Sequence, residues 1–99
     1  MTPSIINSET LSDGTRVVIA STCGVCSQMI RIEVKNDKVQ SVQFFGGCHG
    51  NGQGVAALCR GMKVSDVTAR LKGIRCGDKR TSCPDQLAQV LEQMNVTGK

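Results

Sequence analysis

The sequence predicts a single small α+β domain, in which an antiparallel β-sheet is covered on one face by three helices. The chain has 99 residues and 39% of them are apolar, which is enough for one hydrophobic core. Apolar and polar residues alternate over residues 29–45, as they do in a half-buried β-hairpin. Further along the chain, apolar residues recur at the spacing of an α-helix. We therefore expect the element order β-β-α-α-α.

Residues 1–22 are predicted to form an N-terminal arm or edge strand, and residues 23–96 the main domain. The first fifteen residues are polar and contain the turn signal Ser12-Asp13-Gly14, so we expect a loose arm or an edge there. Residues 16–20 have the composition of one short strand. The predicted sheet therefore rests mainly on the hairpin that follows.

The hairpin is predicted at residues 29–45. Its turn is the polar stretch Asn36-Asp37-Lys38, which is typical of a tight connection between two strands. The alternation gives the hairpin one apolar side, made of Ile30, Ile32, Val34, Val42 and Phe44. We expect this side to be buried.

A glycine-rich stretch over residues 46–54 is predicted to be a loop that links the hairpin to the first helix. Five of its nine residues are glycine. The helix after it would carry an apolar stripe at positions i, i+3, i+4 and i+7, formed by Val55, Leu58, Cys59 and Met62. Gly61 is expected to interrupt this helix.

A second, short helix is predicted after residue 64. Ser65 and Asp66 have the residue types of a helix cap. Val67 and Leu71 would form its apolar face, and Ile74 is a further candidate for that face.

The last helix is predicted to begin with Pro84 at its first position and to run to about Met94. Its inner face would carry Leu87, Val90, Leu91 and Met94. Cys83 directly precedes the proline, so its sulfur would lie at the positive end of the helix dipole, where a thiolate is favoured over a thiol. A thiolate is the form that a metal ligand or a sulfur nucleophile requires.

The N-terminus lacks the basic flank and the apolar stretch of a secretory signal, and no segment has the length of a membrane span. We therefore expect a cytoplasmic location and no membrane association. Thiols stay reduced in that compartment, so the six cysteines favour a metal or redox site over disulfides. A chain with no Trp or Tyr and only two Phe would also gain stability from disulfides or a metal.

The formal net charge is +4, and five basic residues cluster in one stretch: Arg70, Lys72, Arg75, Lys79 and Arg80. Such a cluster can contact phosphate or nucleic acid. Aromatic residues for base stacking are not interleaved with it. We interpret the cluster as a solvated surface whose field favours thiolates at nearby cysteines, and we do not expect a nucleic-acid partner.

Four cysteines share one setting, in loops or turns at the edges of predicted elements: Cys26, Cys48, Cys76 and Cys83. Glycine lies close to three of them and gives the backbone freedom to turn a sulfur toward a shared site. Six residues separate Cys76 from Cys83, which suits two ligands brought together by a turn. Four thiolates satisfy a tetrahedral zinc ion or an iron–sulfur cluster. The alternative is four unrelated buried thiols.

The two other cysteines and the only histidine have separate interpretations. Cys23 forms a Cys-x-x-Cys pair with Cys26, but a strand follows it where a thioredoxin-like motif has a long helix. We interpret Cys23 as a spare ligand or as a resolving thiol for Cys26. Cys59 lies on an apolar helix stripe and is interpreted as a core residue. His49 is an auxiliary ligand, a proton shuttle or a solvated loop residue.

Four ordered motifs resemble those of the TSCPD domain family, most closely its small stand-alone, four-cysteine branch. They are Gly24-Val25-Cys26-Ser27, Phe45-Gly46-Gly47-Cys48, Leu71-Lys72-Gly73-Ile74-Arg75-Cys76-Gly77 and Thr81-Ser82-Cys83-Pro84-Asp85. The resemblance covers about residues 24–94. It marks Cys26, Cys48, Cys76 and Cys83 as the family cysteines and leaves Cys23 and Cys59 as extras.

The resemblance implies a link to ribonucleotide reduction. The family is similar to the extreme C-terminal segment of cobalamin-dependent ribonucleotide reductases, and its stand-alone members are often labelled ribonucleoside-diphosphate reductase. This chain is too short for the barrel, the radical-cofactor site and the nucleoside pocket of a complete reductase. A supporting role, such as passing reducing equivalents through thiols, is compatible with its length.

A fainter similarity connects the chain to NifU-type iron–sulfur scaffold proteins. Cys26, Cys48 and Cys83 would take the places of three cysteines there, and the similarity implies a NifU-scaffold-like fold. Such scaffolds carry an aspartate two residues after the first cysteine, whereas this chain has Gln28. This difference counts against cluster assembly.

Three functions from different classes therefore remain. The first is a structural zinc module that binds a protein partner, with a ribonucleotide reductase as the expected partner. The second is a thiol-redox part of a ribonucleoside-diphosphate reductase system. The third is an iron–sulfur or sulfur carrier. The sequence does not decide whether the chain is an enzyme.

Overall fold

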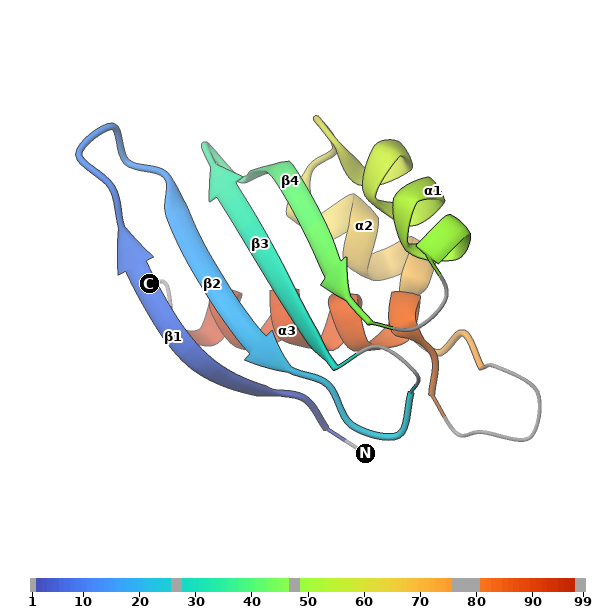
Figure 1. Ribbon diagram of the computed structural model, residues 1–99. Helices are drawn as coiled ribbons and strands as arrows, with labels where there is room; N and C mark the ends of the chain where they lie inside the picture. Colours follow the sequence, from blue (N-terminus) through green and yellow to red (C-terminus); the bar gives the residue numbers. More distant parts are fainter. Residues whose placement is uncertain (1, 26–27, 47–48, 76–80, 98–99) are drawn as a thin grey trace.

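The computed structural model describes residues 2–25, 28–46, 49–75 and 81–97, and of residues 49–51 and 95–97 it describes the backbone only. The elements are β1 (Ser4–Thr10), β2 (Arg16–Ser21), β3 (Met29–Lys35), β4 (Lys38–Phe45), α1 (His49–Cys59), α2 (Val64–Leu71) and α3 (Cys83–Thr97). The strands form one antiparallel sheet in the order β1-β2-β3-β4. Figure 1 shows α2 and α3 behind the sheet and α1 beside β4. The predicted α+β class, a small antiparallel sheet with three helices, is confirmed.

The sheet has two more strands than the predicted hairpin supplies. Residues 16–20 fall within β2, as their composition predicts, and Val18 and Ala20 pair with Ile32 and Ile30 of β3. In the polar N-terminal segment the structure forms the edge strand β1 and no loose arm. The side chains of β1 are mostly exposed, and its pairing with β2 shifts register after Ile5. Because so few side chains of β1 are buried, its sequence shows no alternation of apolar and polar residues that would predict a strand.

The hairpin of β3 and β4 has the predicted position, turn and buried side. Asn36 and Asp37 have positive φ angles of 53° and 65°, the conformation of the tight turn that asparagine and aspartate tolerate. Ile30 and Ile32 are fully buried, and Phe44 is partly buried against the core. The turn and the alternation therefore specify this hairpin locally.

Helix α1 begins earlier than predicted, inside the glycine-rich stretch expected to be a loop. The helix starts at His49 and includes Gly50, Gly52 and Gly54. Gly52 is buried, and a Cβ atom placed on it would lie 3.3 Å from the Phe44 side chain of β4. Glycine therefore permits close contact between α1 and β4, and this contact outweighs the poor helix propensity of glycine.

The predicted apolar stripe of α1 is wrong in two members. Leu58 is 77% exposed, and Met62 lies beyond the helix, which ends at Cys59. The side that faces the protein carries Gly52, Val55, Ala56 and Cys59, which again have i, i+3, i+4 and i+7 spacing. Gly61 has a φ angle of 84° and lies just past the end of α1, consistent with the prediction that it interrupts this helix.

Helix α2 starts one residue before its predicted cap. Its N-cap residue is Lys63, which makes no side-chain capping hydrogen bond, and Ser65 and Asp66 lie within the first turn. Asp66 is placed favourably there, because a negative charge complements the positive end of a helix. Val67 is buried as predicted, whereas Ile74 lies beyond the helix and is 42% exposed.

Helix α3 has the predicted apolar face. Leu87, Val90 and Leu91 are fully buried and Met94 is 3% exposed. They pack with residues of the sheet and of the other two helices, among them Val18, Ile32, Cys59 and Val67. No helix in the described part of the chain combines the length and apolar character needed to cross a membrane.

Candidate functional site

The predicted metal ligands fall partly outside the part of the chain that the structure describes. Cys26, Cys48 and Cys76 lie outside the described residues, whereas Cys83 is the first residue of α3 and is 8% exposed. Of the two auxiliary residues, Cys23 is exposed and His49 is described by its backbone only. Among the described residues, no three His, Cys, Asp or Glu side chains gather as metal ligands would. The four-cysteine site therefore stays a prediction.

The start of α3 is capped by Ser82. Its Oγ accepts a hydrogen bond from the Asp85 backbone N–H at 3.1 Å, and its carbonyl accepts the first helical bond, from the Gln86 N–H, at 2.8 Å. Pro84 is thus the second helical residue, one position later than predicted, because serine is the better N-cap. The Ser82 hydroxyl also donates to the Ile74 carbonyl at 2.6 Å. The cap therefore ties the helix to the segment before it.

The Asp85 carboxylate accepts several hydrogen bonds near the start of α3. It accepts from the Gly73 N–H at 2.7 Å, from the Thr81 hydroxyl at 2.5 Å and from the Gln89 amide at 2.9 Å. Burial raises the pKa of Asp85, but these hydrogen bonds and the charge of Lys72 outweigh burial, so its pKa lies below the usual value. Asp85 is therefore a buried anion that holds two other segments.

Gln86 makes the corresponding connection to the segment between β2 and β3. Its side chain is fully buried. The Oε1 atom accepts a hydrogen bond from the Cys23 backbone N–H at 3.0 Å, and Nε2 donates to the Thr81 hydroxyl at 3.0 Å. These two contacts fix the orientation of the amide, since only one end of it can donate. The amide therefore joins the Cys23 segment to the start of α3.

The end of β4 lies against the same β2–β3 connection. The Thr22 N–H donates to the Gln28 carbonyl at 3.0 Å, and the Gln28 N–H donates to the Phe45 carbonyl at 2.7 Å. Gly46 follows with a φ angle of 80°, and a Cβ placed on it would lie 3.5 Å from the Gln28 side chain. Described residues that flank each of the four predicted ligands are therefore linked by hydrogen bonds at one end of the sheet.

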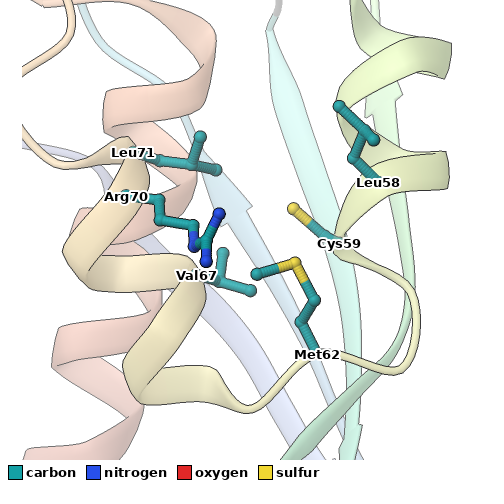
Figure 2. A pocket seen from close by; sticks show the side chains of 6 residues that line it. All are labelled: Leu58, Cys59, Met62, Val67, Arg70 and Leu71. Atoms are coloured by element: carbon teal, nitrogen blue, oxygen red, sulfur yellow. The ribbon is translucent and has the colours of Figure 1, made fainter.

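The structure has a second, apolar site around the other buried cysteine. A cavity of about 170 Å³ lies between α1 and α2, lined by Leu58, Cys59, Met62, Val67, Arg70 and Leu71. Figure 2 shows the Cys59 sulfur and the Arg70 guanidinium directed toward the space between the two helices. Cys59 is 3% exposed and belongs to the hydrophobic core, as predicted. Burial raises the pKa of this thiol, which disfavours the thiolate that a metal would need.

Sequence reasoning missed the polar residues around Cys83. Thr81, Ser82, Asp85 and Gln86 are at most 5% exposed, and each makes at least one hydrogen bond. The spacing Ser82-x-x-Asp85 before an apolar helix is a capping signal that the sequence did contain. The partners Gly73 and Cys23 carry no such signal, because they lie 12 and 63 positions away along the chain.

Comparison with known proteins gives one positive result. The family model of the TSCPD domain matches residues 6–95, from within β1 to within α3. No curated protein and no solved structure matches the chain. The match begins earlier than residue 24, so it includes the strands β1 and β2 that precede the cysteine motifs.

Proposed function

Because this chain belongs to the TSCPD domain family, we propose that it is a small metal-binding module in which Cys26, Cys48, Cys76 and Cys83 hold one zinc ion. The module is accessory to another protein, and the family resemblance suggests a ribonucleotide reductase as that protein. It acts in the cytoplasm, without membrane or nucleic-acid association.

One observation carries the proposal: described residues within three positions of each of the four cysteines make hydrogen bonds at one end of the fold. Cys83 opens α3, where Ser82 binds Ile74 and Asp85 binds Gly73, two and three residues before Cys76. Gln86 binds Cys23, which precedes Cys26 by three residues. Figure 1 shows the end of β2, the start of β3 and the end of β4 at this side of the sheet.

Short covalent distances support the same proposal. Cys26 follows Val25, Cys48 comes two residues after Gly46, and Cys76 follows Arg75. Consecutive Cα atoms are about 3.8 Å apart, so each cysteine is attached within two residues of a described position. Four thiolates that meet at one point would match the tetrahedral set of a structural zinc site, with bonds of about 2.3 Å.

A thiol-redox role is the second candidate, and Cys23 favours it. Cys23 is exposed and lies at Cys-x-x-Cys spacing from Cys26. An exposed thiol beside a second cysteine can exchange with a partner's disulfide, which is the chemistry that a ribonucleoside-diphosphate reductase needs for its own reduction. An iron–sulfur cluster on the same cysteines is the further alternative.

Metal analysis of the full chain tests the proposal. We expect aerobically purified protein to be colourless and to contain about one zinc per chain, measured by inductively coupled plasma mass spectrometry. Each of Cys26→Ser, Cys48→Ser, Cys76→Ser and Cys83→Ser is expected to lose the zinc. Cys23→Ser and Cys59→Ala are the matched controls and should retain it.

Other outcomes assign the alternatives. Brown protein with visible absorption would favour the iron–sulfur carrier. Metal-free protein in which Cys23 and Cys26 form a reversible disulfide would favour the redox role. Zinc retained at full occupancy in Cys83→Ser would contradict the ligand set. In that case the serine acts as another hydroxyl at the helix start, beside the cap that Ser82 provides.

A further inference from the structure

The burial of Asp85 and Gln86 is not needed to stabilise α3 as a helix. A helix of this length needs a cap and an apolar face. Ser82 supplies the cap, and the buried side chains from Leu87 to Met94 supply the apolar face. Gln86 is fully buried and Asp85 is 5% exposed. Polar side chains are rarely buried this completely, because they lose their contacts with water. Their specific contacts therefore call for a separate explanation.

These contacts join segments that no regular element connects. Asp85 receives the Gly73 N–H, from the segment that leads to Cys76. Gln86 receives the Cys23 N–H, from the segment that leads to Cys26. Thr81 links the two, because its hydroxyl donates to Asp85 and accepts from Gln86. One turn of α3 thus holds both segments through backbone N–H groups.

We propose that Asp85 and Gln86 are positioning residues that fix the two cysteine-bearing segments against the start of α3 before a metal binds. The inference rests on the proposed function, since it concerns the geometry of the same four cysteines. Neither residue is a ligand. Each accepts a hydrogen bond from a backbone N–H that lies three residues before a proposed ligand, Cys76 for Asp85 and Cys26 for Gln86.

The energetic consequence concerns the metal affinity more than the fold. If the loops of a site are already ordered without metal, metal binding costs less conformational entropy. Outer groups that orient metal ligands typically account for 10- to 100-fold in affinity. Removal of the Gln86 contact should therefore weaken zinc binding by at least about tenfold.

The chain offers a matched control on the same helix. Gln93 donates its amide to the Pro3 carbonyl at 2.8 Å, so it too ties a distant backbone segment to α3. It lies seven residues, or about 10 Å along the helix axis, beyond Gln86. Gln86→Leu and Gln93→Leu each remove a contact to a distant backbone segment and keep a side chain of similar size, and Gln86→Leu also removes the hydrogen bond to Thr81.

The test compares the zinc affinity of wild type, Gln86→Leu and Gln93→Leu by competition with a chromophoric chelator. Amide hydrogen exchange at Cys23 is measured in parallel on the reduced, metal-free chain. We expect Gln86→Leu to weaken zinc binding at least tenfold and to abolish the protection of the Cys23 amide. Gln93→Leu should change the affinity less than about twofold and leave that amide protected.

Each failure has its own signature. The positioning role would be overturned if the two variants bound zinc with equal affinity, or if the Cys23 amide were unprotected in the metal-free wild type. In either case, zinc binding by the wild type would still support the metal site. A wild-type chain that binds no zinc with all its cysteines reduced would overturn both proposals. If Gln86→Leu does not fold, Thr81→Val is the second variant, since it removes the hydroxyl between Asp85 and Gln86 and is expected to weaken zinc binding in the same direction.

Discussion

Cys59 and Cys83 are both almost completely buried, at 3% and 8% exposure, yet their surroundings differ. Cys59 lies in the apolar cluster beside the cavity between α1 and α2. Cys83 lies in the first turn of α3, which Ser82 caps and in which Asp85 accepts three hydrogen bonds. The comparison teaches that burial alone does not indicate what a thiol does. The hydrogen-bonding groups around it carry that information.

The variant with the largest expected effect, Asp85→Ala, tests how much the hydrogen bonds around Cys83 contribute to the stability of the fold. Asp85→Ala removes the acceptor of three hydrogen bonds and leaves the Gly73 N–H and the Thr81 hydroxyl without it. Hydrogen bonds to a charged group contribute about 1.5–3 kcal/mol each, and the losses are not additive. We expect the free energy of unfolding, measured by urea denaturation, to fall by about 3 kcal/mol.

Asp66→Ala is the control for the helix dipole. Asp66 also lies in the first turn of a helix, but it is exposed. Its removal should cost at most about 0.5 kcal/mol, because an exposed charge at a helix start contributes little. Similar losses in the two variants would mean that the Asp85 hydrogen bonds contribute little to stability. The polar surroundings of Cys83 would then differ less from the apolar surroundings of Cys59 in their energetic importance.

The second prediction addresses the apolar side of the comparison. Cys59→Ala removes a buried sulfur beside an existing cavity of about 170 Å³. The loss of packing should lower the free energy of unfolding by about 1 kcal/mol without any loss of metal. Leu58→Ala is the control on the same helix, because Leu58 is 77% exposed and its removal should change stability by less than about 0.5 kcal/mol. Loss of zinc in Cys59→Ala would make Cys59 a candidate ligand.

The sequence predicted the elements whose signals are local. The alternation of Ile30 and Ile32, the turn at Asn36-Asp37 and the stripe from Leu87 to Met94 each lie within a few residues of one another, and all three are confirmed. The N-terminal edge strand has no such signal, because most of its side chains face solvent. Periodicity is informative only where one side of an element is buried.

Parts of the site could not be predicted because they depend on contacts between distant residues. The Cys23–Gln86 hydrogen bond joins residues that are 63 positions apart, and the sequence gives no pattern that pairs them. The special setting of Cys83 at a helix start was predicted, because proline and the apolar stripe mark that helix locally. Residues Cys26, Cys48 and Cys76 lie outside the described residues, so their convergence stays a prediction.

The smallest expected effect concerns the glycines of α1, the helix that carries Cys59. Gly52 and Gly54 both lie inside this helix, where alanine is normally more favourable by about 1 kcal/mol. A Cβ on Gly54 would meet nothing within 4 Å, whereas one on Gly52 would lie 3.3 Å from two atoms of Phe44. We expect Gly54→Ala to raise the free energy of unfolding by about 0.5–1 kcal/mol, measured by urea denaturation. Gly52→Ala should gain less than Gly54→Ala or lose stability, because Phe44 or the helix must shift to admit the methyl group. An equal gain in both variants would show that α1 can move away from β4, and the close contact would then not explain why this helix begins within a glycine-rich stretch.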